Sequence, residues 1–333
     1  MSIHYVGHLS AHDPLHDYLH YDILPQFGQK SQRSTFRVFE MGGSNEVYLY
    51  QEKQSQVQVV GKFFHQHNSS GMEREFHNLC LLRSYGLENR PHCVVRPLGY
   101  NAWLNALLVE EYCRGRSLSN FILNAIFHGQ RDALYKKLTA LAYFLATQHN
   151  RTANGYGVNF HEDCTYLNHI VHKLARKHHI SPAEEEELYW LRDRWREQPR
   201  IWEDQQVLVH GDATPSNFLF GCGLEVFAID LENMKRADRV FDVGRIAGEL
   251  QHFFLQHTGN KYEAEPFIGH FLWEYSCHFP DRYSAFRSIC NRIPYQMGLT
   301  LLRIARNSWV SDNYRRTLIE EAKTTLRNYW KTY

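Results

Sequence analysis

The order of strand-forming and helix-forming segments constrains the fold of this 333-residue chain more than any other feature. Residues 36–64 contain three short runs rich in Val, Phe and Tyr, and the turn-forming residues 42–45 separate the first two runs. A helical pattern follows over 73–85, and two more strand candidates occupy 94–98 and 106–111. We therefore expect a small β-rich region that contains a single helix.

Helical periodicity dominates the rest of the chain. Leucine and alanine recur at helical spacing over 134–145, and residues 181–184 form a capping box with proline at the first helical position. Two short strand candidates, 207–209 and 226–229, interrupt the helices. Further helices are expected over 118–127, 238–257, 262–277 and 313–331.

Together these patterns predict an α+β fold with two lobes. A small β-rich N-terminal lobe would be joined through a short hinge to a large, mostly helical C-terminal lobe. An N-terminal extension of unknown role would precede them. The expected boundaries of extension, N-terminal lobe, hinge and C-terminal lobe are 1–35, 36–111, 112–116 and 117–333.

Composition and charge exclude several classes of protein. Apolar residues make up 43% of the chain and charged residues 22%, which is ordinary for a globular protein and excludes a disordered chain. Lys and Arg number 37 against 36 Asp and Glu, so the net charge of +1 gives no general attraction to nucleic acid or to an anionic membrane. The seven cysteines lack CxxC spacing, and from the residues at hand we expect neither a secretory leader nor a membrane-spanning apolar run. We expect a cytoplasmic protein with free thiols, and the sequence leaves its oligomeric state open.

The stretch 208–232 carries the most specific chemistry. An apolar strand leads into a His-Gly-Asp run that ends at Asp212, Asn217 follows five positions later, and a second strand ends at Asp230. The Gly-Cys-Gly turn between the two strands would bring these polar residues to one end. Phosphoryl transfer needs a carboxylate that orients or deprotonates a hydroxyl, and hard oxygen ligands for Mg²⁺. Asp212 suits the first task, and Asn217 and Asp230 suit the second. The spacing H-x-D-x-x-x-x-N is that of the kinase catalytic loop, and Asp230 falls where the DFG aspartate of kinases would lie.

The β-rich lobe supplies the groups that nucleotide phosphates need. Its glycine turn offers backbone amides that no Cβ obstructs. Lys62 ends an apolar strand and could reach the phosphates, and Glu75, thirteen residues later, could pair with it. A strand ending near Glu111 runs into the linker, whose backbone could meet the adenine edge. The expected ATP contacts are Gly42, Gly43, Ser44, Asn45, Lys62, Glu75, Glu111 and Cys113.

In these residues the chain resembles the aminoglycoside phosphotransferase and choline kinase family, small-molecule kinases with a protein-kinase-like fold. The matching pieces occur in family order between about residues 36 and 250. They are GGSNEVYLY, VVGKFF, EREFHNLCLL, LLVEEYCRG, HGDATPSNFLF, FAIDLEN and VFDVGRIAGEL. The resemblance implies a bilobal kinase-like fold, ATP and Mg²⁺ as cofactors, and a small-molecule hydroxyl as the acceptor.

The same resemblance implies roles for individual residues. Asp212 would be the catalytic aspartate in a loop over 208–220, and the segment 226–232 would bind the metal. ATP positioning would fall to Lys62 and Glu75, metal binding to Asn217, Asp230 and Glu232, and support of the catalytic loop to His210 and Asp242.

The chain lacks two motifs that protein kinases have, and their absence bears on which kind of kinase it could be. The chain has no G-x-G-x-x-G loop, and no A-P-E run follows Asp230, so a regulated activation segment has no room. This argues against a protein kinase. A catalytically silent pseudokinase that binds nucleotide or a partner protein is the alternative, although all the expected polar residues are present.

The sequence leaves the acceptor open. We expect the helical region after Asp242 to choose it, because ATP would occupy the N-terminal lobe. That region mixes acidic and basic residues and shows no recognisable cage of aromatic residues for a quaternary amine. Glu249, two helical turns beyond Asp242, is the first candidate for substrate binding, and a solvated helix carboxylate is the alternative.

Near the N-terminus, histidines recur every four positions. A metal-binding stripe would need one continuous helix, whereas Asp13 and Pro14 have the pattern of an N-cap and a first helical residue. That start leaves only two of the histidines on one helical face. The five are His4, His8, His12, His16 and His20.

Overall fold

A computed structural model describes residues 3–29, 33–42, 46–64 and 69–331. The chain divides into two units, which are described separately. The first unit comprises Met1–Gly115 and Phe227–Asn233, and the second comprises Arg116–Val226 and Met234–Tyr333.

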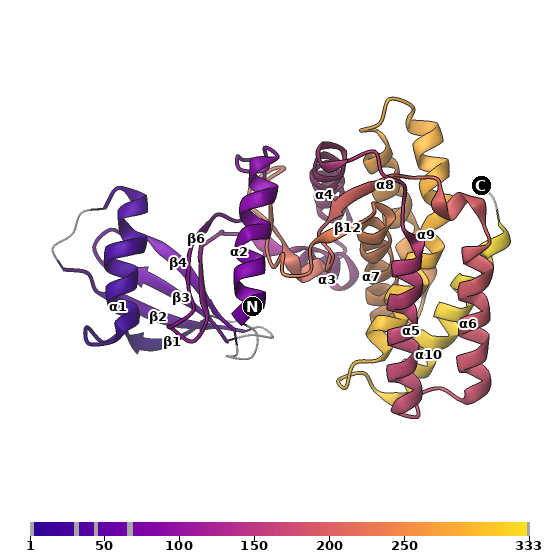
Figure 1. Ribbon diagram of the computed structural model, residues 1–333, viewed down its shortest axis with the longest axis horizontal. Coiled ribbons are helices and arrows are strands. Elements are labelled where there is room, and N and C mark those ends of the chain that lie inside the picture. Colours follow the sequence, from indigo (N-terminus) through magenta and orange to yellow (C-terminus); the bar gives the residue numbers. More distant parts are fainter. Residues whose placement is uncertain (1–2, 30–32, 43–45, 65–68, 332–333) are drawn as a thin grey trace. The chain divides into compact units, whose positions relative to one another are not determined.

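A six-stranded antiparallel sheet with the order β1-β2-β3-β4-β7-β6 organises the first unit (Figure 1). The strands predicted over 36–64 and 106–111 belong to it. The first unit also contains the helix α2 and the short strand β5. The bounds are β1 Ile3–His8, β2 Phe36–Met41, β3 Glu46–Glu52, β4 Gln58–Phe63, α2 Ser69–Ser84, β5 His92–Val94, β6 Pro97–Asn101 and β7 Leu107–Glu111.

Residues before the first predicted strand complete the core of this unit. Strand β1 pairs with β2, and a helical segment follows it, made of α1 (Pro14–Tyr18), a π-helical turn (Leu19–Ile23) and a 3-10 turn (Leu24–Phe27). Leu15 and Leu19 from this segment are buried against Phe36, Tyr50 and other side chains of the sheet. The extension to which the sequence assigned no role thus closes one face of the sheet.

The helix near the N-terminus begins at Pro14, as Asp13 and Pro14 predicted, so the five histidines do not share one continuous helix. The Asp13 carboxylate caps α1 by accepting a hydrogen bond from the Leu15 N–H. His16 and His20 stack on one face of the helical segment, with ring centroids 6.3 Å apart, and both contact Ser34. These contacts give the two rings a packing role between the helix and the chain that leads into β2.

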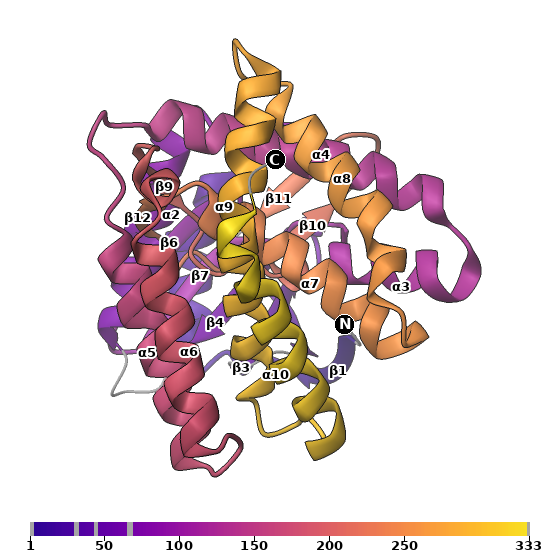
Figure 2. The ribbon, with the colours of Figure 1, turned by 90° about the vertical axis from the view of Figure 1, so that its right-hand side faces the viewer.

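The second unit is predominantly helical (Figure 2). Two small antiparallel pairings, β8 with β10 and β9 with β12, accompany its helices. The helices are α3 Leu118–His128, α4 Arg131–Thr152, α5 Phe160–Arg176, α6 Pro182–Arg196, α7 Val240–Thr258, α8 Glu265–Ser276, α9 Arg282–Ala305 and α10 Asp312–Leu326. The strands are β8 Arg116–Ser117, β9 Gln206–Val209, β10 Phe218–Phe220 and β12 Lys235–Asp238, while β11 (Val226–Ala228) begins where the chain passes back to the first unit.

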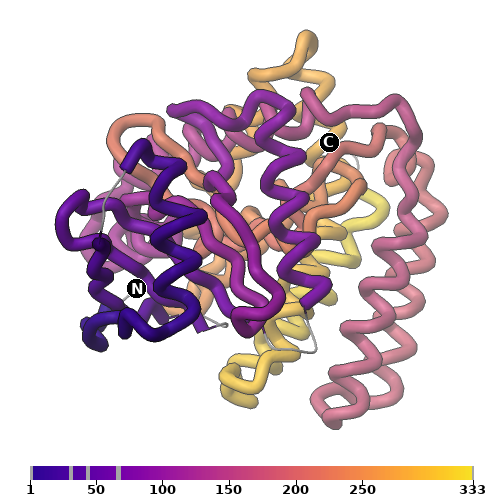
Figure 3. The backbone as a smooth tube through the Cα atoms, turned by 60° about the vertical axis from the view of Figure 1, so that its left-hand side comes forward, coloured from indigo at the N-terminus to yellow at the C-terminus, as the bar shows by residue number. Residues whose placement is uncertain are grey.

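Two long helices, α5 and α9, were not predicted from the sequence. Pro294 lies inside α9, and buried polar residues such as Arg292 and Gln296 interrupt its apolar pattern. The α5 segment, in contrast, has apolar residues at helical spacing that could have identified it. Helix α5 forms a hairpin with α6 (Figure 3), and side chains of α5, α6, α9 and α10 form one apolar core.

Helices α7 and α9 approach closely because glycine lies between them. A Cβ at Gly244 of α7 would stand 2.4 Å from the Gln296 Cβ of α9, which is closer than two carbon atoms can lie. The pairing matters for function because α7 also carries Asp242. No helix among the described residues is both long and apolar enough to cross a membrane.

We predict that Gly244→Ala destabilises the protein by about 1–3 kcal/mol, the usual cost of overpacking a closely packed contact. Gly269→Ala in α8 is the matched control, because a Cβ there meets no atom within 4 Å. That change should be neutral or stabilise by up to about 1 kcal/mol, since alanine favours helix. Urea unfolding measures both, and equal stabilities of the two variants would contradict the close contact.

Candidate active site

Lys62 is the centre of the polar cluster in the first unit. Its Nζ atom lies 2.7 Å from Glu75 Oε2, which comes from α2, and 2.7 Å from Asp230 Oδ1. Lys62 is 7% exposed and Glu75 is fully buried. Burial alone would lower the pKa of Lys62, but the charges of Glu75, Asp230 and Glu110 raise it above its ordinary value. Lys62 is therefore a charged ammonium at neutral pH.

The strand pattern of β4 explains where Lys62 points. Val59 faces the apolar core, so Lys62, three positions later, faces the opposite side of the sheet. Its cross-strand neighbours are Val47 on β3 and Leu108 on β7. An apolar strand that ends with a lysine on the face away from the core thus presents that lysine to α2.

The segment 227–233 brings Asp230 to Lys62. The Asn78 amide donates to the Leu231 carbonyl at 2.8 Å, and Arg74 Nε donates to the Glu232 carbonyl at 3.0 Å, so α2 holds the segment at two points. Asp230 has a φ of 65°, in the left-handed region that non-glycine residues rarely adopt. Such strain persists where surrounding contacts enforce it, and it is common at functional sites.

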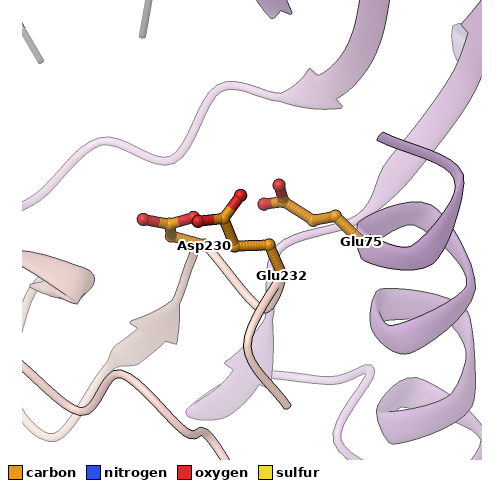
Figure 4. Close-up of side chains that lie close together, drawn as sticks. All are labelled: Glu75, Asp230 and Glu232. Carbon is orange, nitrogen blue, oxygen red and sulfur yellow. The ribbon is translucent and has the colours of Figure 1, made fainter. Parts of the chain in front are cut away.

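Three carboxylates of this cluster could hold a divalent cation. Ligand oxygens of Glu75, Asp230 and Glu232 lie within 4.8 Å of one another, and their side chains point toward a common region (Figure 4). Mg²⁺ prefers such hard oxygen ligands. Glu75 Oε1 is buried and lacks a hydrogen-bond partner among the described residues, so it retains an unused acceptor. The donor set therefore fits the metal that the resemblance implies.

Of the other residues predicted to contact ATP, those that the structure describes do not belong to the Lys62 cluster. Gly42 is exposed directly after β2, whereas Gly43, Ser44 and Asn45 lie outside the described residues. The N–H of Glu111 donates to the Arg96 carbonyl at 2.9 Å, at the end of β7. Burial raises the pKa of the Cys113 thiol well above its ordinary value, so this cysteine is neutral.

Glu110, which the sequence patterns did not single out, belongs to the same cluster. It is 6% exposed, its pKa is raised by burial, and its position opposite Val60 puts it on the same sheet face as Lys62. Its Oε1 atom has no hydrogen-bond partner among the described residues. The signal was available, because alternation along β7 places Leu108 and Glu110 on one side.

In the second unit, Asp242 holds the loop that carries Asp212. The backbone N–H groups of His210 and Gly211 donate to the Asp242 carboxylate at 2.6 and 3.1 Å, and His149 Nε2 lies 3.2 Å from it. Gly211 has a φ of 81°, which a residue with a side chain rarely adopts. Burial would raise the pKa of Asp242, but its hydrogen bonds with His149 and the His210 backbone, together with nearby charges, hold it below its ordinary value.

Asn217 and Asp212 lie together. Asn217 Nδ2 donates to the Asp212 carbonyl at 2.9 Å and lies 3.4 Å from Asp212 Oδ2. The Asp212 side chain is 27% exposed, so its carboxylate can meet a ligand, whereas Asn217 is buried. The His210 ring packs on Phe218, with centroids 5.1 Å apart, and fixes the other end of the loop.

Two arginines that the sequence did not single out contact Asp212. Arg245 Nη1 lies 2.8 Å from Asp212 Oδ1, and Arg303 Nη1 lies 3.6 Å from the same oxygen. Glu249, predicted to bind substrate, is buried and pairs with Arg303 at 2.5 Å, so it is not a solvated carboxylate. Arg245 could have been found one turn after Asp242 on α7, but Arg303 lies on the unpredicted helix α9.

The predicted site residues therefore form two groups. One is Lys62, Glu75, Asp230 and Glu232 in the first unit, and the other is His210, Asp212, Asn217, Asp242 and Glu249 in the second. The joint use of Asn217 and Asp230 as metal ligands joins residues of both units and stays a prediction.

Comparisons with known proteins identify the family and the fold. The sequence model of the Phosphotransferase enzyme family matches residues 35–272. The fold is similar to that of a Plasmodium vivax ethanolamine kinase, with a TM-score of 0.60 and 14% identity over 89% of this chain and 83% of the other. None of the curated protein sequences compared with the chain matches it.

Two further solved structures share the fold. The ADP-bound aminoglycoside phosphotransferase APH(2'')-Ib has a TM-score of 0.55 and 12% identity, over 93% of this chain and 99% of the other. The amicoumacin kinase hAmiN, in complex with AMP-PNP, Ca²⁺ and its antibiotic, has a TM-score of 0.55 and 15% identity over 88% of each chain. The predicted α+β kinase-like fold is thereby confirmed.

We predict that Asp242→Asn lowers the free energy of unfolding at pH 7 by about 1–3 kcal/mol, because a buried backbone N–H loses its acceptor. Since its pKa is lowered in the folded state, Asp242 contributes stability that is present above about pH 4 and lost as the pH falls further. The difference between variant and wild type should therefore shrink at acidic pH. Urea unfolding tests this, with the exposed Asp132→Asn as control, and an unchanged midpoint at pH 7 would count against the role.

Proposed function

Because the chain belongs to the Phosphotransferase enzyme family, we propose that it transfers the γ-phosphoryl group of ATP to a hydroxyl of a small molecule. The observation that carries the proposal is the pair of 2.7 Å contacts of Lys62 with Glu75 and Asp230. These three residues come from a strand, a helix and a segment far along the chain. Their convergence gives the lysine, helix glutamate and aspartate that phosphoryl transfer uses to position nucleotide phosphates.

Asp212 acts on the acceptor. Its carboxylate accepts a hydrogen bond from the acceptor hydroxyl and orients the oxygen for attack on the γ-phosphorus. The new bond joins that oxygen to phosphorus, the bond between phosphorus and the β–γ bridging oxygen breaks, and ADP leaves. The hydroxyl proton passes to the Asp212 carboxylate and then to solvent. Arg245 holds Oδ1, and Oδ2, whose one described contact is with Asn217 Nδ2 at 3.4 Å, is the oxygen assigned to the acceptor.

Lys62 and the acidic residues act on the nucleotide. The Lys62 ammonium, charged at neutral pH, donates to phosphate oxygens, and Glu75 keeps it in place. Asp230 and Asn217, with Glu232, supply the oxygens for Mg²⁺, which when bound neutralises the charge of the phosphates. In this assignment the first unit handles ATP, and Asp212 in the second handles the acceptor.

A catalytically silent phosphotransferase fold is the alternative. It would bind nucleotide without acceptor-stimulated release of ADP. We expect ADP release to rise when the purified chain with Mg²⁺ and ATP receives a suitable member of a panel of sugars, amino alcohols, sugar acids and nucleosides. Nucleotide binding without stimulation by any of them would favour the silent alternative.

We predict that Asp212→Asn lowers kcat by about two to four powers of ten, the range for losing a general base. The change keeps the shape of the side chain and removes its charge. Affinity for ATP, measured by calorimetry, should stay within about twofold, because Asp212 is assigned to the acceptor. Asp132→Asn controls for the loss of a surface charge, and full turnover of the Asp212 variant would refute the assignment.

We predict that Asp230→Ala removes most of the effect of Mg²⁺ on nucleotide affinity, because the metal loses a charged oxygen ligand. ATP affinity is measured with Mg²⁺ and with EDTA in each protein. The control is Glu73→Ala, which removes an exposed carboxylate from α2 outside the cluster. If Mg²⁺ strengthens ATP binding equally in the variant and the wild type, the metal ligands lie elsewhere.

A further inference from the structure

Arginine side chains lie against Asp212 in the second unit. Arg245 and Arg303 both reach Asp212 Oδ1, at 2.8 and 3.6 Å. Lys235 lies over the Phe241 ring, 4.2 Å from its centroid, and the Arg245 guanidinium lies over the same ring at 5.0 Å. An acceptor whose hydroxyl reaches Asp212 must therefore lie beside the two arginines.

Asp212 and Glu249 already have cationic partners. Asp212 pairs with Arg245, and Glu249 pairs with Arg303 through a 2.5 Å contact. A cationic acceptor such as an amino alcohol would need a carboxylate of its own, and it would also meet the guanidinium groups. Placing like charges side by side at a binding site costs affinity. The geometry therefore disfavours an ammonium group close to Asp212.

Arg303 retains unused donors. A guanidinium has five N–H groups, and the hydrogen bond described for Arg303 goes from Nη2 to Glu249. Its Nε is buried without a hydrogen-bond partner among the described residues, and its Nη1 makes only the 3.6 Å ion pair with Asp212. Its side chain is 16% exposed, so part of it can meet a ligand. Arginine is the residue best suited to bind carboxylate and phosphate groups.

We propose that the acceptor carries an anionic group, a carboxylate or a phosphate, close to the hydroxyl that receives the phosphoryl group, and that Arg303 binds it. The inference rests on the proposed function, because it takes Asp212 as the residue that meets the acceptor hydroxyl. It deepens that function by separating this chain from kinases of cationic alcohols. Glu249 then acts through Arg303, as a positioning residue.

A matched set of polyols tests the proposal by calorimetry on the whole chain. Gluconate, sorbitol and 1-amino-1-deoxysorbitol share one carbon skeleton and carry negative, zero and positive charge, and sorbitol 6-phosphate distinguishes phosphate from carboxylate. We expect at least one of the two anions to bind ten times more tightly than sorbitol, and the amine to bind most weakly. An anion preference below about twofold, including the absence of any binding, would overturn the proposal, as would preference for the amine.

Substitutions of Arg303 test whether this residue causes the preference for anions. Arg303→Met should reduce the anion preference to about twofold or less. The double variant Arg303→Met with Glu249→Gln should do the same, and it removes both charges of the buried pair if the single variant is unstable. Arg287→Met, an exposed arginine of the same helix, is the control and should keep the preference. A preference that survives both Arg303 variants would show that the anion binds elsewhere and would overturn the assignment.

Release of ADP separates this inference from the proposed function. Binding of an anion without ADP release from ATP would leave the anion site in place and count against phosphoryl transfer to that compound. Release of ADP stimulated by the amine but by neither anion would support the phosphotransferase and refute the anionic acceptor.

Discussion

The buried carboxylate of Asp242 organises the loop that carries Asp212 in the second unit. It accepts hydrogen bonds from two consecutive backbone N–H groups, those of His210 and Gly211, and it contacts the buried ring of His149. A buried charge is costly unless hydrogen bonds satisfy it, so the loop and the helix hold each other in place. Arg245, one turn later on the same helix, donates a hydrogen bond to the side chain of Asp212. Helix α7 thus fixes both the backbone and the carboxylate of the proposed catalytic residue.

Short, strongly patterned segments could be predicted from the sequence, and features that depend on distant packing could not. The α+β kinase-like fold followed from the strand-rich segment, the helical remainder and the motif residues, and it is confirmed. Asp13 and Pro14 correctly marked a helix start. The core position of residues before 36 had no local signal, because pairing of β1 with β2 depends on residues about 30 positions apart.

In the candidate site too, residues within one local motif could be predicted from the sequence, and contacts between distant helices could not. Residues within motifs, such as Asp212 and Asn217, were found because their spacing is fixed by one loop. Arg303 was missed because its helix contains a proline and buried polar residues, and both weaken the apolar pattern that identifies helices. Glu249 was predicted to bind substrate, with a solvated carboxylate as the alternative, and the structure shows it buried and paired with Arg303. Which acid pairs with which base is a property of packing between helices.

The segment Phe227–Asn233 belongs to the first unit although the chain on both sides of it belongs to the second. The backbone therefore passes from one unit to the other three times, and the first unit consists of two separate stretches of sequence. No single cut of the chain yields two complete units, because cleavage between residues 115 and 116 would leave Phe227–Asn233 in the fragment that carries the second unit. For the same reason, the two units could not be inherited or exchanged as independent modules, because the first unit would lose Asp230.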